Sequence, residues 1–424
     1  MVSLLKMPKN ELESLQNTLR DQYEDFKAKE YNFDMTRGKP SSDQLDLCNE
    51  MIKDDSLYND PKSSNGIDCR NYGVLDGIPE CKQLFAELLD VDEKNIIIGG
   101  NSSLNLMFDY VSQCMTHGSG DLPWAAQGRI KFACPVPGYD RHFTICEHFG
   151  IEIVNVPMLD DGPDMDFLAD LVKDSSVKGM FCVPKYSNPE GKTFSDAAVK
   201  KLAALKPAAK DFRVIWDNAY CIHDLNATPD NLINIFDACK EYGSEDMFVE
   251  FASTSKISFP GSGISVIVAS DNNIDAIKKR FFAQTIGYDK LNQLRHARFF
   301  KNAQGVRDHM KKHAQILYPK FEAVTSALEK ELTGLEIASW NKPNGGYFVS
   351  LNAMDGCAKR IVELCKQAGL VLTPAGATYP YKNDPNDSNI RIAPTFPPVE
   401  DLKVAVQILC LCMKLAAVEK LLQK

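Results

Sequence analysis

The chain has 424 residues and a formal net charge of -9 at pH 7, with 44% hydrophobic and 25% charged residues. Because a single hydrophobic core rarely grows past about 250–300 residues, this length favours two or three domains of an ordinary soluble globular protein. The acidic balance argues against nucleic acid as the main partner, since phosphate binding needs a concentrated basic surface.

Targeting and anchoring signals are not evident in the sequence. The N-terminal stretch MVSLLKMPKNELESLQ has no apolar core of signal-peptide length. Residues 404–418 are the most apolar late segment, but they include Gln407 and Lys414 and fall short of the roughly 20 residues that span a bilayer. They predict a buried helix rather than a membrane span. The 13 cysteines are scattered without a C-x-x-C pair, which fits a reducing, cytoplasmic location.

The first predicted element is a helix within residues 8–31, which combine helical periodicity with good helix formers. Residues 32–70 are rich in Pro, Ser, Asn and Asp and predict a long, loop-rich arm. From about Asn95, short apolar runs alternate with helical stretches. The strand candidates, in chain order, are NIIIGG, IKFACPVPG, IEIVNVPM, KGMFCVPKYSNPEG, FRVIWDNAY, MFVEFASTSK and GISVIVAS.

This alternation predicts an α/β domain with a mostly parallel sheet sandwiched by helices, which we assign to residues 50–315. Several of the apolar runs are nearly continuous, as expected of strands covered on both faces. The pattern is helical from Asn273 to Lys330, and short strands and helices follow to the C-terminus. Residues 316–424, with the N-terminal segment 1–49, therefore predict a second, smaller α+β domain.

Polar residues follow three of the predicted strands. Asn188 opens an Asn-Pro-Glu-Gly turn, Asp217 comes directly off an apolar run with Tyr220 after it, and Lys256 follows Ser253 and Ser255. In open α/β sheets, ligands bind beyond the carboxyl ends of the strands. A carboxylate at the end of a buried strand is costly unless a cationic group meets it. For Lys256 taken alone, a solvated surface lysine is the competing interpretation.

Taken together, these residues suit a lysine Schiff base to pyridoxal 5'-phosphate. Asp217 would keep the pyridine nitrogen protonated, so that the ring accepts electrons from the substrate, and Tyr220 and Asn188 would hydrogen-bond the ring's phenolic oxygen. A phosphate site is suggested by NIIIGGNSSLNLMF, a strand, a Gly-Gly turn and a helix that opens with Asn101 and Ser102. Plain N-capping by these residues is the alternative.

With these residues in place, the chain resembles the fold-type I aminotransferases, the aspartate aminotransferase superfamily. The motifs TRGKP, RNYGVLDGIPE, GGNSSL, PVPGYD, SNPEG, DNAY, STSK, NGGYF, VLTPAG and RIAP run in the family's order over residues 36–394. Any one of them occurs by chance, whereas the ordered set is specific. The likeness is strongest to the atypical bacterial aspartate aminotransferases, which are often grouped with MocR-type aminotransferases.

The resemblance implies a role for each matched position in cofactor binding. Lys256 is expected to form the Schiff base and to move protons, while Asp217, Tyr220 and Asn188 bind the ring. Tyr139 is expected to stack on the ring. The expected phosphate ligands are Ser253, Asn101 and Ser102. Tyr72 is expected to reach the phosphate bound by a partner subunit. The last of these implies a homodimer with shared active sites.

The same resemblance implies a substrate site for small amino acids and 2-oxo acids. Arg391 is expected to clamp the substrate α-carboxylate, with Asn188 beside it, and Gly38 to line the pocket. A dicarboxylic substrate needs a further cation, and the sequence leaves five candidates open, namely Arg37, Lys39, Arg141, Lys185 and Arg298.

One position departs from the family pattern. Typical members carry a phosphate-binding arginine eight residues after the lysine, where this chain has Ile264. Ser258, Ser262 and backbone N–H groups are the substitutes that the segment ISFPGSG offers, unless another cation replaces the arginine.

Two other clusters predict no site. His309 and His313 stand four residues apart, but a third metal ligand is not evident and the nearby Lys and Asp residues indicate a solvated face, so we expect no metal. Cys410 and Cys412 lie in an apolar helix and are expected to pack in the core.

The expected reaction is transamination, with L-aspartate as amino donor and 2-oxoglutarate as acceptor. Transamination of aromatic, aminoadipate-like or other amino acids, and β-lyase chemistry, would use the same residues and differ in the pocket for the substrate side chain. A ligand-sensing regulator of the MocR type is a further alternative. It is disfavoured because 35 residues precede TRGKP, too few for a DNA-binding domain, and because the chain is acidic.

Overall fold

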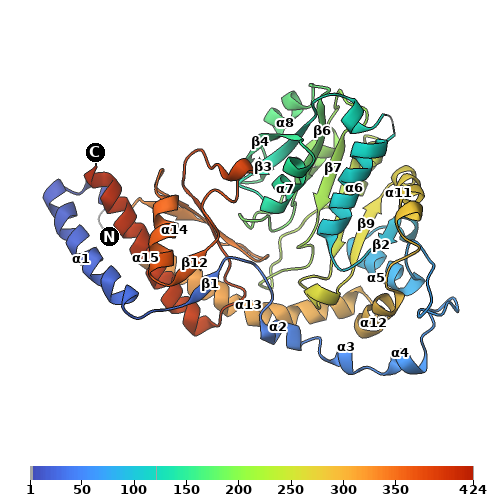
Figure 1. The fold of residues 1–424 in the computed structure, drawn as a ribbon, viewed down its shortest axis with the longest axis horizontal. Helices are drawn as coiled ribbons and strands as arrows, with labels where there is room; N and C mark the ends of the chain where they lie inside the picture. Colours follow the sequence, from blue (N-terminus) through green and yellow to red (C-terminus); the bar gives the residue numbers. More distant parts are fainter. Residues whose placement is uncertain (1–2, 121, 424) are drawn as a thin grey trace.

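A mixed, mostly parallel sheet forms the centre of the larger part of the molecule (Figure 1). The computed structural model describes residues 3–120 and 122–423. Within them the sheet has eight strands in the order β2-β9-β8-β7-β6-β3-β4-β5. Their bounds are β2 Ile96–Ile98, β3 Lys131–Val136, β4 Glu152–Leu159, β5 Gly162–Pro163, β6 Val177–Cys182, β7 Arg213–Asp217, β8 Phe248–Ser253 and β9 Ser265–Ala269.

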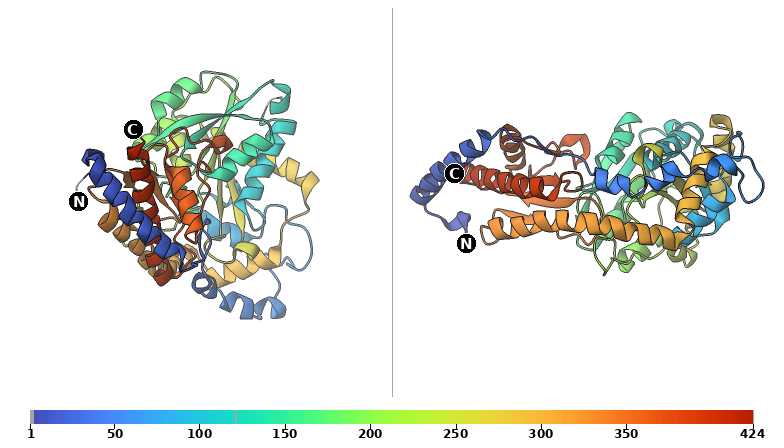
Figure 2. Two further views of the ribbon diagram at one scale, coloured as in Figure 1. Left: turned by 60° about the vertical axis from the view of Figure 1, so that its left-hand side comes forward. Right: turned by 90° about the horizontal axis from the view of Figure 1, so that it is seen from below.

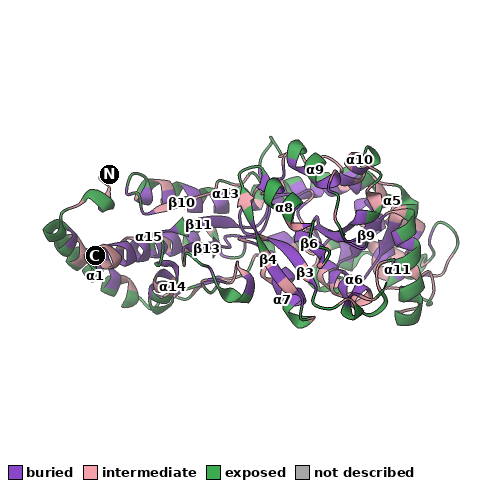
Figure 3. Ribbon diagram, turned by 90° about the horizontal axis from the view of Figure 1, so that it is seen from above, coloured by how far each residue is buried: buried purple, intermediate pink, exposed green. Residues whose placement is uncertain are grey.

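The strand directions confirm the mostly parallel sheet. β4, β3, β6, β7 and β8 pair in parallel, while β9 runs antiparallel to both β8 and β2. β2 therefore points the same way as β8. All seven strand candidates from the sequence are strands of this sheet, and β6, β7, β8 and β9 are buried at every position (Figure 3). Continuous apolar runs such as these belong between two helical layers.

Helices cover both faces of this sheet. One face packs against α6 (Ser103–His117), α7 (Asp140–His148) and α11 (Asp271–Gln284). The other packs against α8 (Met165–Leu171), α9 (Asp196–Ala203) and α10 (Ile235–Lys240), and farther along against α5 (Pro79–Leu89) and α12 (Lys290–Phe300). Because side chains alternate along a strand, β2 contributes to both faces of the sheet. Ile97 packs on the side of α6, α7 and α11, while Ile96 and Ile98 pack on the side of α5 and α12.

A smaller antiparallel sheet forms the second part of the molecule. Its order among the described residues is β10-β11-β13, made of Ala338–Trp340, Val349–Ala353 and Asn389–Ile392. β1 (Phe33–Met35), from the N-terminal arm, pairs in parallel with β12 (Leu370–Leu372). α1 (Lys9–Lys27), α14 (Ala358–Gln367) and α15 (Val399–Leu422) pack together at this end, where Figure 2 shows both chain termini.

The long helix α13 (Ala303–Leu332) runs beneath both parts of the molecule (Figures 1 and 2). It begins against α12 and α5 of the large part and later packs against α15 of the small part. The boundary that we drew between residues 315 and 316 falls inside this continuous helix and stays a prediction. Pro319 lies within the same helix.

The arm of residues 32–70 is more regular than expected. Besides β1 it contains three short helices, α2 (Ser42–Asp46), α3 (Glu50–Lys53) and α4 (Ser56–Asn59), which lie along the large part. The apolar segment near the C-terminus is helix α15, as predicted, and it buries Cys410 and Cys412. Within the described residues, helices long and apolar enough to cross a membrane are absent.

Candidate active site

The predicted site residues meet at the carboxyl edge of the large sheet. Parallel strands present their carboxyl ends at one edge, so β2, β3, β6, β7 and β8 all deliver the residues that follow them to the same place. Asp217 ends β7, and Lys256 follows β8 in the turn after Ser253. Asn188 follows β6, and Tyr139 follows β3 at the start of α7.

The Lys256 amine lies beside a pair of stacked aromatic rings. Its Nζ is 5.0 Å from the ring centre of Tyr220 and 5.7 Å from that of Tyr347, and these two rings stack on each other at 6.0 Å. Burial lowers the pKa of Lys256 below its usual value, and the nearby Asp217 opposes this shift. A lysine with a lowered pKa is more often neutral, and a neutral amine is a nucleophile and a base.

The carboxylate of Asp217 is buried and has one oxygen to spare. His142 Nε2 lies 3.0 Å from Oδ2, while Oδ1 is buried without a hydrogen-bond partner among the described residues. The His142 ring stacks on Phe181, with ring centres 4.5 Å apart, and this contact fixes its orientation. An unpaired buried carboxylate oxygen is costly, so Oδ1 is placed to accept from an N–H group of a ligand.

Two tyrosines line the space in front of Asp217. Tyr220 is buried, and burial raises the pKa of its hydroxyl well above the usual value, with Tyr139 and Asp217 adding to the shift. Tyr139 packs edge-on against His142, with ring centres 5.0 Å apart. Burial raises the pKa of Tyr139 as well. Both hydroxyls therefore stay protonated at neutral pH and can donate hydrogen bonds.

Arg391 comes from the small sheet, on β13, and reaches the same space. Its Nη1 donates to Asp140 Oδ1 at 3.0 Å and to Asn188 Oδ1 at 3.2 Å, and Nη2 donates to Thr373 at 3.4 Å. The guanidinium lies 4.9 Å from the ring centre of Phe348. Its Nε is buried without a hydrogen-bond partner within the described part of the chain.

Gly38 borders this arginine site. A Cβ atom at position 38 would lie 2.6 Å from the Phe348 ring, so the TRGKP loop approaches the ring as closely as it does because residue 38 has no side chain. Tyr72, by contrast, is 80% exposed on the loop before α5. Its predicted contact with a partner subunit stays a prediction.

The expected anion-binding residues form a connected group of polar side chains. Ser102 is the N-cap residue of α6, and Asn101 precedes it. Ser255 Oγ donates to the backbone oxygen of Asn101 at 3.1 Å, and Ser253 Oγ lies 3.1 Å from Ser255 Oγ. Hydroxyl groups and the amino end of a 15-residue helix are therefore side by side.

The departure at Ile264 has a clear structural setting. Ile264 is buried, and its backbone N–H donates to Thr254 Oγ1 at 2.9 Å. Of the two serines that we considered as substitutes, Ser258 is occupied elsewhere, since its buried hydroxyl contacts Thr254 Oγ1 at 3.0 Å and His296 Nε2 at 2.8 Å. Ser262 accepts from Arg295 Nη2 at 2.6 Å.

The five candidate cations for the side-chain carboxylate of a dicarboxylic substrate differ in the groups that they contact. Lys185 pairs with Asp224 at 3.0 Å and Arg298 pairs with Asp60 at 3.2 Å, so both already have a counter-ion. The Lys39 ammonium lies 3.9 Å from the ring centre of Phe396. Arg37 is exposed next to Gly38. These two positions flank the glycine that borders the Arg391 site.

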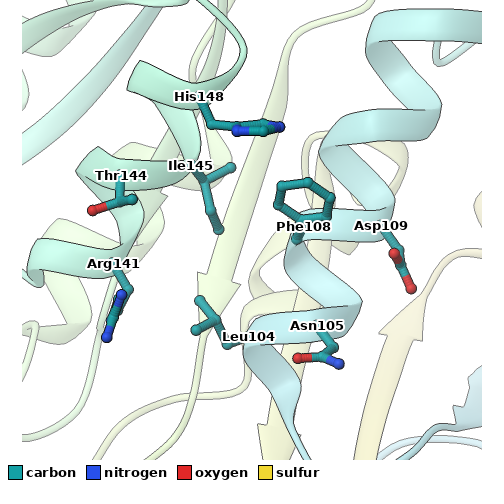
Figure 4. A pocket seen from close by; sticks show the side chains of 8 residues that line it. All are labelled: Leu104, Asn105, Phe108, Asp109, Arg141, Thr144, Ile145 and His148. Carbon is teal, nitrogen blue, oxygen red and sulfur yellow. The ribbon is translucent and has the colours of Figure 1, made fainter.

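Arg141, the fifth candidate, lines a separate pocket between α6 and α7 (Figure 4). The pocket has a volume of about 350 Å³. Arg141 and His148 come from α7, while Phe108 and Asp109 come from α6 (Figure 4). The Phe108 and His148 rings lie 5.2 Å apart.

The two histidines of α13 do not lie on a solvated face, which corrects our expectation. Both are buried, because the arm packs over that side of the helix. His309 Nε2 lies 3.0 Å from His313 Nε2 and 3.4 Å from Cys48 Sγ, and Gln44 Nε2 joins His313 Nδ1 to the hydroxyl of Tyr347. In the described part of the chain, His, Cys, Asp and Glu side chains form no group suited to a metal ion.

A buried glutamate stands behind the site. Glu250, on β8, accepts from Asn218 Nδ2 at 2.7 Å, and Asn218 directly follows Asp217. Burial raises the pKa of Glu250 from 4.5 to about 7. The folded chain thus holds this proton more tightly than the unfolded chain. Its contribution to stability is present below pH 4.5 and is lost as the pH rises to about 7.

We expect Glu250→Gln to remove this pH dependence, because an amide cannot ionise. The variant should match the native chain near pH 4.5 and exceed its unfolding free energy at pH 8 by on the order of 3 kcal/mol. Urea unfolding at the two pH values measures the difference. Glu241→Gln, at an exposed position, is the control. A difference that is the same at both pH values would contradict the assignment.

The donor set fits pyridoxal phosphate. A protonated pyridine nitrogen suits the unpartnered Asp217 Oδ1, an aldehyde suits the desolvated Lys256 amine, and a phosphate suits the hydroxyl groups at the start of α6. The Tyr139 ring is near enough to Asp217 to cover a ring bound there, since His142 touches both residues.

Comparison with known proteins agrees with this geometry. The chain is 45% identical over 403 residues to the aspartate aminotransferase of Corynebacterium glutamicum, covering 95% of this chain and 93% of that protein. The crystal structure of an aspartate transaminase from Corynebacterium glutamicum ATCC 13032 superposes with a TM-score of 0.96 at 43% identity, covering 99% of each chain. The fold and the site define a fold-type I aminotransferase.

The family follows from a match over almost the whole sequence. The family model described as aspartate amino-transferase matches residues 7–424, and the chain belongs to this family. A more distant structure, LysN, an α-aminoadipate aminotransferase of Thermus thermophilus complexed with N-(5'-phosphopyridoxyl)-L-leucine, has a TM-score of 0.75 at 18% identity and covers 92% of this chain and 93% of its own. That likeness shows the fold.

Sequence reasoning missed two residues of the site. His142 contacts Asp217 from a position 75 residues away, and Asp140 pairs with Arg391 across 251 residues. The motif PGYDRHF held a signal for His142, because it stands three residues after Tyr139 on the same helix face. The pairing of Asp140 with Arg391 had no such local signal.

Proposed function

We propose that the chain is a pyridoxal phosphate-dependent aminotransferase that transfers the amino group of L-aspartate to 2-oxoglutarate. The arrangement of Lys256, Asp217 and Arg391 around one space carries this proposal. The choice of aspartate is supported by the name of the 45% identical relative from Corynebacterium glutamicum.

The cofactor, when bound, supplies an electron-accepting ring that stabilises negative charge on the substrate α-carbon. Asp217 accepts a hydrogen bond through Oδ1 and keeps its partner nitrogen protonated, while His142 holds the carboxylate in place. Tyr220 and the side-chain amide of Asn188 would each donate a hydrogen bond to the phenolic oxygen of the cofactor. Tyr139 covers the ring face.

Lys256 would form the covalent bond to the cofactor aldehyde, and its amine would also act as the base. With substrate bound, its Nζ would take the proton from the substrate α-carbon and later return one. Burial assists both roles, because it lowers the pKa of the amine and so raises the neutral fraction. The rings of Tyr220 and Tyr347 lie beside the amine.

Arg391 binds the substrate α-carboxylate through the planar fork of its guanidinium. Without substrate, Nη1 is shared between Asp140 and Asn188. The substrate carboxylate takes the place of the Asp140 carboxylate on Nη1, and Asn188 and Thr373 keep the arginine oriented. For the side-chain carboxylate, we propose Arg37 and Lys39, which flank Gly38 beside this site.

Arg391→Ala should weaken L-aspartate binding without removing the cofactor. Losing two charged hydrogen bonds should raise the KM for L-aspartate about 100-fold or more, while the visible absorbance of bound pyridoxal phosphate stays as in the native chain. Steady-state kinetics and a cofactor titration measure both quantities. Arg129→Ala, at an exposed arginine, is the control. An unchanged KM would show that another residue binds the α-carboxylate.

We further propose a cytoplasmic homodimer with shared active sites, in which Tyr72 contacts the phosphate of the partner subunit. The exposure of Tyr72 and of the nearby Phe282 and Ile286 supports this, because large exposed apolar side chains favour a protein interface. We also propose that residues 50–315 form the cofactor domain, and residues 1–49 with 316–424 the small domain.

Visible absorbance of the purified protein, before and after L-aspartate is added, tests the proposal. We expect the band of lysine-bound pyridoxal phosphate to convert to that of pyridoxamine phosphate, and 2-oxoglutarate to reverse the change. A band that does not change with aspartate but changes with an aromatic amino acid or aminoadipate would show that this amino acid, and not aspartate, is the substrate. Release of a β-substituent with pyruvate formation would indicate a lyase. A chain without the band in the presence of pyridoxal phosphate would overturn the proposal.

A further inference from the structure

Arg295 on α12 is a partly buried cation that has no counter-ion within the part of the chain that the structure describes. Its Nη2 donates to Ser262 Oγ at 2.6 Å and to the side-chain oxygen of Asn292. Among residues 3–120 and 122–423, its Nε is buried without a hydrogen-bond partner, and no carboxylate forms an ion pair with this arginine. Asn292, one helical turn earlier, also donates to the backbone oxygen of Gly263 at 2.8 Å.

An arginine in this setting calls for an anion. A guanidinium is charged at every pH at which the protein folds, so burial cannot be relieved by loss of a proton. Serine and asparagine oxygens supply partial charges only, and a buried charge without an opposite charge is costly. The N–H groups of a guanidinium match the oxygens of a phosphate or carboxylate.

The nearest group built for an anion is the polar cluster at the start of α6. Ser262 ends the short turn Pro260–Ser262, and Asn101 Nδ2 donates to the backbone oxygen of Pro260 at 3.2 Å. Ser255 contacts the backbone oxygen of Asn101, and Ser253 contacts Ser255. The turn Pro260–Ser262 therefore contacts Arg295 through Ser262 and the proposed phosphate site through Pro260.

We propose that Arg295 supplies the positive charge that holds the phosphate of pyridoxal phosphate, acting with Ser262, in place of the strand arginine that is missing at Ile264. This inference rests on the proposed function. The two positions are compatible in space, because Ile264 and Gly263 begin the return into β9 from the same turn that carries Ser262. Replacing the arginine of one element by that of another preserves the charge.

Binding of pyridoxal phosphate compared with pyridoxal, which lacks the phosphate, tests this inference without measuring turnover. In the native chain, both should give the absorbance of a lysine-bound aldehyde. Arg295→Gln should weaken pyridoxal phosphate binding about 10- to 100-fold and leave pyridoxal binding nearly unchanged. Arg295→Lys should recover part of the loss, since it restores the charge without the planar fork. Arg280→Gln, at an exposed arginine of α11, should change neither.

The outcomes separate this inference from the proposed function. A native chain that gives no absorbance with either compound would refute the cofactor itself. A native chain that binds both, with an Arg295→Gln variant that keeps the native ratio of the two affinities, would refute the role of Arg295 alone. A variant that loses both compounds equally would assign Arg295 a structural role. Ser262→Ala, a smaller change to the same contact, should lower only the affinity for the phosphorylated compound and covers the case in which Arg295→Gln fails to fold.

Discussion

Lys256→Ala should abolish transamination and the visible absorbance of lysine-bound pyridoxal phosphate together. The variant loses both the covalent bond and the base, so kcat should fall by at least about 10⁴-fold. An absorbance spectrum of the variant with added pyridoxal phosphate, and single-turnover conversion of L-aspartate, measure the two losses separately. The physical reason lies in the site, where this amine lies beside the rings of Tyr220 and Tyr347 and near Asp217.

Two comparisons sharpen the result. Small primary amines added to Lys256→Ala should restore part of the turnover, because they can serve as the missing base. Lys200→Ala, at an exposed lysine of α9, should behave as the native chain does. A normal absorbance band in Lys256→Ala would mean that another lysine binds the cofactor, and the central assignment would fail.

Asp217→Asn should leave the cofactor bound but slow its chemistry. An amide is nearly the same size as the carboxylate and can still contact His142, yet it cannot stabilise a protonated pyridine nitrogen. We expect kcat to fall by about 10²- to 10³-fold, the usual effect of removing one preorganised charge interaction. Kinetics after reconstitution with pyridoxal phosphate measure the loss.

The control for this variant is Asp196→Asn, at an exposed aspartate of α9. It should leave kcat and the absorbance spectrum as they are in the native chain. Reconstitution of Asp217→Asn with a pyridoxal phosphate analogue that carries a permanent positive charge at the ring nitrogen should recover activity. If Asp217→Asn were as fast as the native chain, the ring nitrogen would not need its carboxylate, and the residue would be structural.

Most of the fold could be predicted from patterns between residues that are close in the sequence, in segments long enough to show a period. β7 and β8 are apolar runs followed by polar residues, and that pattern is visible without any contact information. α2, α3 and α4 escaped prediction because each has five residues or fewer, too short to show a helical period. The buried state of His309 and His313 depends on the arm, which lies more than 250 residues earlier in the chain.

The candidate cations show what the sequence could not rank. Lys185 and Arg298 pair with Asp224 and Asp60, and both pairs join segments that are distant in the sequence. The contact between Arg295 and Ser262 could not be predicted either, because the two residues are 33 positions apart in the sequence. The order of the motifs identified the residues that follow the strands. Which charged residues pair with one another depends on the folded chain.

The helix α13 connects the two parts of the molecule that carry the site. Arg391 belongs to the small sheet and Lys256 to the large one, and α13 lies under both as a single rod of about 45 Å. Because α13 is one continuous helix, a change in the distance between Arg391 and Lys256 requires this helix to bend. Pro319 is the point of least resistance, because it removes one backbone hydrogen bond near the middle of the helix.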